Sequence, residues 1–96
     1  MKLAVIAVDK ARQNDVVAVL DAHGVPGYSL IPSVLGRGDT GAHFGTRAFP
    51  GDNAMIVALV TADQLTAVRA GLRTLSGTLR AGQGLMAIGL DAEQLV

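Results

Sequence analysis

Two segments of this chain carry apolar side chains on both faces that an extended backbone presents. Apart from Lys2, residues 2–8 are aliphatic, and residues 54–60 read Ala-Met-Ile-Val-Ala-Leu-Val. Successive side chains of a strand point to opposite faces of a sheet, so a strand of this composition needs cover on both sides. Both segments are therefore expected to lie in the middle of a sheet, which restricts the folds open to the rest of the chain.

Helix signals follow each of these two strands. Asp9 and Asn14 are candidate N-caps of a first helix, which should end just before Gly24. Thr61 and Gln64 have the spacing of a capping box and should begin a second helix. The apolar stripe of that second helix consists of Leu65, Val68, Leu72 and Leu75.

The remaining strands are expected at residues 28–35 and 85–90. Pro32 cannot donate a backbone hydrogen bond, so the first of them should be an edge strand or contain a bulge. The resulting order, βαββαβ, predicts an α+β fold of the ferredoxin-like type, a four-stranded antiparallel sheet with two helices on one face. At 96 residues the chain is expected to be a single domain, residues 1–96.

Two helices can cover only one face of such a sheet, which leaves the second apolar face without cover. A domain of this size is often only marginally stable alone. Large exposed apolar patches mark association sites, and another copy of the same chain is the simplest cover. The sequence therefore predicts an oligomer.

Composition removes several classes of function. Eight basic residues balance eight acidic ones, so a nucleic-acid-binding face is not expected. The chain has no cysteine, which excludes disulfides, thiolate metal sites and a cysteine nucleophile. It has no apolar run of about 18 residues, so no direct membrane insertion is expected. A cytoplasmic location is the default expectation.

A long glycine-rich segment, residues 36–53, interrupts this scaffold and holds five of the twelve glycines. Loops of this length are usually functional or disordered. Clustered glycines allow successive N–H groups to converge on an anion. The candidate ligand-binding residues of this segment are Gly36, Arg37, Gly38, Thr40 and Arg47. A hairpin tip with solvated arginines is the alternative, and a dinucleotide fold is not indicated because a strand rather than a helix follows.

Two other functions compete with anion binding. A metal site would use His43 with a loop carboxylate, but such scattered ligands do not define a site, and a surface histidine is the simpler interpretation. An acylphosphatase would use an arginine and an asparagine, for which Arg47 and Asn53 are available. No catalytic motif surrounds them, so the chain is not expected to be an enzyme.

Five segments of the chain, residues 1–8, 14–20, 23–30, 35–38 and 78–85, carry the pattern of one known family. On these segments, most of the chain resembles the PII signal-transduction family of nitrogen regulatory proteins. The resemblance implies a homotrimer with ligand sites in the clefts between subunits, where an adenine nucleotide lies between the base of the T-loop and the B-loop of the neighbour. The T-loop, here 37–52, would control a target protein, such as a membrane transporter or an enzyme. The B-loop residues at the ligand would be Arg80, Gly82, Gln83 and Gly84.

The chain also departs from the usual pattern of that family. Gln83 replaces an acidic residue, Leu85 replaces a lysine, and Gly38 replaces a glutamine that is tied to magnesium and 2-oxoglutarate. The T-loop is short and has no tyrosine to modify. These departures predict a sensor for an adenine nucleotide or another small anion, with no certain cofactor, rather than a standard nitrogen regulator that senses 2-oxoglutarate.

Overall fold

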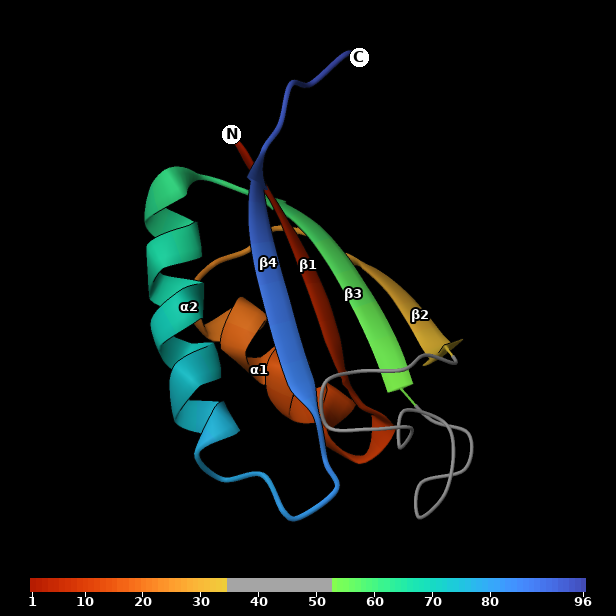
Figure 1. Ribbon diagram of the computed structural model, residues 1–96. Coiled ribbons are helices and arrows are strands. Elements are labelled where there is room, and N and C mark those ends of the chain that lie inside the picture. Colours follow the sequence, from red (N-terminus) through yellow and green to blue (C-terminus); the bar gives the residue numbers. More distant parts are fainter. Residues whose placement is uncertain (35–52) are drawn as a thin grey trace.

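The computed structural model describes residues 1–34 and 53–96 (Figure 1). The elements are β1 (Lys2–Asp9), a 3-10 turn η1 (Lys10–Arg12), α1 (Gln13–Ala22), β2 (Ser29–Val34), β3 (Asn53–Val60), α2 (Ala62–Ser76) and β4 (Leu85–Asp91). The predicted order βαββαβ is confirmed. Strand bounds differ from those expected by a residue or so at each end.

The four strands form one antiparallel sheet in the order β2-β3-β1-β4. As predicted, β1 and β3 lie in the middle, and β2 and β4 lie at the edges (Figure 1). The pairing of β2 with β3 shifts between Ile31 and Val34, on either side of Pro32. The proline therefore occupies an irregular edge position, because it has no N–H to give to a ladder.

Both helices lie on the same side of the sheet; in Figure 1 α1 is seen behind the strands and α2 to the left of them. The core forms between them and alternate residues of the two central strands. Its fully buried large side chains are Ile6, Val8, Val16, Leu20, Ile56 and Val68. Burying an aliphatic side chain of this size contributes roughly 1.5–3 kcal/mol, so this layer supplies most of the stability of the fold.

The capping box of α2 is present as predicted. The Gln64 N–H donates to Thr61 Oγ1 at 3.0 Å, and the Thr61 N–H donates to Gln64 Oε1 at 2.9 Å. Gln64 also donates from Nε2 to the carbonyl of Gly24 at 3.0 Å. Gly24 follows α1 with a φ of 70°, a conformation that favours glycine after a helix. The Gln64 side chain thus caps the start of α2 and also bonds to the backbone just after the end of α1.

The start of α1 differs from the expectation. Asp9 Oδ1 accepts the Ala11 N–H at 2.9 Å and so caps the 3-10 turn rather than the α-helix. The α-helix begins at Gln13 after Arg12, which provides no side-chain cap. Asn14 lies inside the helix, so its prediction as an N-cap is wrong. The reason is that the turn from Lys10 already redirects the chain before Asn14 is reached.

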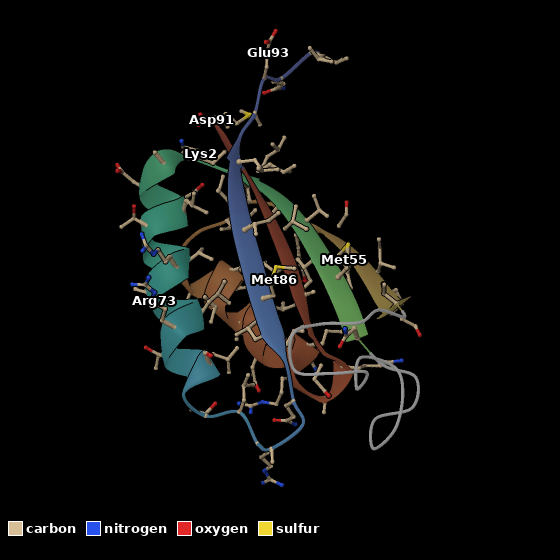
Figure 2. The ribbon with its side chains drawn as sticks, viewed as in Figure 1. Lys2, Met55, Arg73, Met86, Asp91 and Glu93 are labelled. Atoms are coloured by element: carbon tan, nitrogen blue, oxygen red, sulfur yellow. The ribbon has the colours of Figure 1, made fainter. Side chains whose placement is uncertain are left out.

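The face of the sheet away from the helices is apolar throughout its centre. The side chains of this open face form three rows across β3, β1 and β4, as follows from the register: Leu59, Leu3 and Leu90; Val57, Val5 and Ile88; Met55, Ala7 and Met86. Figure 2 shows Met55 and Met86 on this side. Leu59, Met86, Ile88 and Leu90 are each between 45% and 49% exposed. The expectation of two apolar faces is therefore confirmed for the central strands.

In the described part of the chain, the helices are too short or too polar to span a lipid bilayer.

Candidate functional site

Several chain segments converge at one end of the sheet. Asp9, at the end of β1, pairs with Asn53, at the start of β3, and Asn53 also pairs with Val34, at the end of β2. The Asp9 N–H donates to the carbonyl of Gly84 at 2.9 Å, which places the segment before β4 at the same end. Val34 and Asn53, the described residues on either side of the glycine-rich segment, therefore lie at the same end of the sheet as loop 78–84, the connection between α2 and β4.

The predicted site residues are divided between these two segments. Gly36, Arg37, Gly38, Thr40 and Arg47, with the alternative metal ligand His43, lie outside the described residues. Arg80, Gly82, Gln83 and Gly84 lie in loop 78–84.

Loop 78–84 folds around a tight turn from Arg80 to Gln83. The Gln83 N–H donates to the Arg80 carbonyl at 3.0 Å, and the Arg80 N–H donates to Gln83 Oε1 at 2.9 Å. Gly82 has a φ of 84°, a conformation that side chains with a Cβ rarely adopt. Arg80 is exposed, whereas Gly84 is buried against the end of β1. Hydrogen bonds within the loop thus define its backbone, and the exposed side chain of Arg80 places a positive charge at its surface.

Arg12, at the end of η1, fastens this loop to the start of α1. Its Nη2 donates to Thr78 Oγ1 at 2.7 Å, and its Nη1 donates to the Thr78 carbonyl at 3.1 Å and to Gln83 Oε1 at 3.3 Å. Its Nε donates to Asp15 Oδ2 at 2.7 Å. The side chain is only 18% exposed. Sequence reasoning did not find Arg12, because no local pattern links it to residues 66 and 71 positions away.

Buried hydrogen-bond acceptors lie at the same end of the sheet. Asp9 and Asn53 are both more than nine-tenths buried. Asn53 Oδ1 and Gln13 Oε1 are buried and receive no hydrogen bond within residues 1–34 and 53–96. Leaving a buried acceptor unsatisfied costs about 1–3 kcal/mol. Among the described residues, these two acceptors therefore distinguish this end of the sheet from the rest of the core.

The two alternative sites receive no support from the described residues. These residues contain no group of three or more His, Cys, Asp and Glu side chains that could hold a metal ion. Asn53, one half of the pair considered for an acylphosphatase, is buried, and its partner Arg47 lies outside the described residues.

A groove lies apart from this site, between α2 and β4. Its volume is about 460 Å³, and its walls include Leu65, Val68, Leu72 and Ala87, with Arg69 and Arg73 on the helix. Arg80, Gly82, Gln83 and Gly84, the predicted site residues that the structure describes, do not line it.

The chain was compared with known protein families and structures. A family model described as nitrogen regulatory protein P-II matches residues 1–86. The search of curated proteins finds no match.

Solved structures with this fold include CPII from Thiomonas intermedia, a nitrogen regulatory PII-like protein bound to ADP, AMP and bicarbonate. It is 20% identical, with a TM-score of 0.71, over 93% of this chain and 84% of that chain. The apo form of CPII is similar, with 17% identity, a TM-score of 0.66 and coverage of 93% and 87%. A protein from Thermus thermophilus described as a PII-like signaling protein is 18% identical, with a TM-score of 0.61 and coverage of 93% and 83%. At these identities the likeness concerns the fold.

Proposed function

This chain belongs to the nitrogen regulatory protein P-II family, and on that basis we propose that it is a non-enzymatic sensor of an adenine nucleotide or another small anion. The observation that carries the proposal is the end of the sheet where Asp9, Asn53 and Gly84 meet. There, loop 78–84 holds the exposed side chain of Arg80. CPII, which shares the fold, binds ADP, AMP and bicarbonate.

The chemistry of the described residues suits such a ligand. Arg80 is exposed and can pair with a phosphate or carboxylate oxygen through its planar guanidinium.

The proposed assembly is a homotrimer. The open face is apolar and partly exposed, and a second and third copy would remove it from water. In this assembly each ligand site would lie in a cleft between subunits, where segment 37–52 of one copy faces residues 80–84 of the next. Ligand binding would then alter how segment 37–52 contacts a partner protein, such as a membrane transporter or an enzyme.

Three measurements on the full chain test this proposal. Light scattering should give the mass of a trimer, and a stable monomer would contradict the assembly. Calorimetry with AMP, ADP, ATP and bicarbonate should detect at least one ligand, and no binding at millimolar concentration would contradict the sensor. An assay with an acyl phosphate should show no turnover, and measurable hydrolysis would restore the enzyme alternative.

The variant Arg80→Ala should weaken binding of the nucleotide by about 10- to 100-fold, because a hydrogen bond to a charged group contributes about 1.5–3 kcal/mol. Arg69→Ala is the matched control, since it removes the same charge from an exposed position of α2. Equal loss of affinity in both variants would show a general charge effect and would remove Arg80 from the site.

A further inference from the structure

Arg12 connects parts of the molecule that are distant in sequence. It leaves η1, crosses to loop 78–84 and there bonds to both the backbone and the side chain of Thr78 and to the side chain of Gln83. The guanidinium group is planar and donates in fixed directions, so these bonds define where the loop lies as well as holding it. Asp15 accepts from Nε and orients the group from the other side.

The hydrogen bond from Arg12 to Gln83 connects Arg12 to Arg80, the residue proposed to bind the ligand. Gln83 Oε1 accepts from Arg12 and also from the backbone N–H of Arg80, at 3.3 Å and 2.9 Å. The same carbonyl oxygen therefore transmits the position of Arg12 to the backbone that carries the Arg80 side chain. This network uses only Oε1 of Gln83, and the amide nitrogen is not part of it.

The Thr78 contacts fix the other end of the loop. Thr78 Oγ1 donates to the Leu75 carbonyl at 2.7 Å while it accepts from Arg12. The Thr78 N–H bonds to the same carbonyl at 2.9 Å. The last turn of α2 and the start of the loop are thus joined to Arg12 through one hydroxyl group.

We infer that Arg12 is a positioning residue, which holds loop 78–84 in the conformation that binds the anionic ligand without contacting that ligand. The inference rests on the proposed function, because it assigns Arg80 to the ligand. When Arg12 is lost, the loop samples other conformations, and the apparent affinity falls in proportion to the fraction of molecules that keep the binding conformation.

The test compares Arg12→Lys with the wild-type chain in calorimetric titrations with AMP, ADP and bicarbonate. Lysine keeps the charge but cannot bond to Thr78 and Gln83 in the same planar arrangement. Affinity should fall by roughly tenfold, the equivalent of about one lost hydrogen bond. Asp15→Asn, which leaves the loop contacts in place, should give a smaller loss. Arg69→Lys on exposed α2 is the matched control and should bind like the wild type.

Two further readouts separate positioning from other roles. Hydrogen exchange at the amides of Arg80 and Gln83 should accelerate in Arg12→Lys without ligand, while that of Leu65, in the first turn of α2, should not change. In Arg12→Gln, which removes the charge, the dependence of affinity on salt should remain that of the wild type, because Arg12 does not touch the ligand. Faster hydrogen exchange with unchanged ligand affinity would show that Arg12 is only structural. A weaker dependence of affinity on salt would show that Arg12 contacts the ligand directly. Either result overturns the inference.

The proposed function and the role of Arg12 fail in different ways. If wild-type protein binds none of the three ligands, the proposed function is wrong, and the role of Arg12 in ligand binding falls with it. If wild-type protein binds a ligand and Arg12→Lys binds it equally well, only the role of Arg12 is wrong.

Discussion

The two faces of the sheet come from the same strands and carry the same kind of side chain, yet their surroundings differ. On β1, Ile6 and Val8 are fully buried beneath the helices, whereas their neighbours Val5 and Ala7 remain partly exposed on the open face. Composition therefore does not decide which face is covered within the chain. Helices cover the first face, whereas the second stays partly exposed in a single copy. Core packing belongs to the first face, and the proposed assembly would use the second.

The largest expected effect on stability comes from truncating a buried side chain on the helix-covered face. Ile56→Ala should lower the free energy of unfolding by about 2–5 kcal/mol, because the fully buried side chain leaves a cavity between sheet and helices. Urea unfolding followed by circular dichroism measures this loss. Val57→Ala, at the next position of β3 but on the open face, is the matched control. Equal losses in a chain shown to be monomeric would contradict the difference between the two faces.

An intermediate effect should come from placing a charge on the open face. Val57→Glu puts a carboxylate in the central row of the proposed contact between copies, and burying an unpaired charge is costly. We expect the dissociation constant of the assembly to rise by at least about tenfold in light scattering at micromolar concentration, while the circular dichroism spectrum stays that of a folded chain. Ala70→Glu, at an exposed position on α2, adds the same charge and should leave the mass unchanged. An intact assembly in Val57→Glu would move the contact elsewhere.

The smallest effect should come from the ion pair between Lys2 and Asp91. This pair lies at the end of β1 and β4 that is opposite to loop 78–84. Lys2 donates a hydrogen bond to Asp91, and both residues are labelled at the same end of the sheet in Figure 2. This hydrogen bond and the lysine charge hold the pKa of Asp91 below its ordinary value of 3.8. Folding thus favours the ionised carboxylate, so the stabilisation is present above the ordinary pKa and is lost as the pH falls through the lowered pKa.

Urea unfolding of wild-type protein and of Asp91→Asn between about pH 5 and pH 2.5 checks this expectation. The wild type should lose slightly more stability on acidification, and the difference should shrink in high salt because the pair is exposed. An identical pH dependence in the two proteins would show that the pair contributes nothing to folding.

Much of the scaffold was predictable because its signals are local. The capping box of Thr61 and Gln64 is specified within four residues, and Pro32 marks an edge strand through its own missing N–H. The start of α1 was not predictable in the same way. Asp9, which looks like an α-helix cap, instead caps a 3-10 turn, and the two conformations compete over the same few residues.

For the site, the sequence and the family resemblance pointed to loop 78–84 but not to what holds it. Arg80 and Gly82, with its positive φ, belong to residues 78–85, one of the segments on which the family resemblance rests. Arg12 was missed because its bonds to Thr78 and Gln83 exist only after β1 and β4 pair and α1 packs beside them. Gln13 Oε1 and Asn53 Oδ1, which have no donor among the described residues, likewise can be identified as buried acceptors only in the folded structure.

By itself, the sequence determined the βαββαβ order, the central place of β1 and β3, and the surplus of apolar side chains that a single copy cannot cover. Those features follow from side-chain alternation, caps and proline, which act over a few residues. The tertiary structure alone decided that Asp9, Asn53 and Gly84 meet at one end of the sheet and that Arg12 fastens loop 78–84 there. The physical reason is that strand register and helix packing bring together groups that lie far apart along the chain, and no local pattern of residues specifies such contacts.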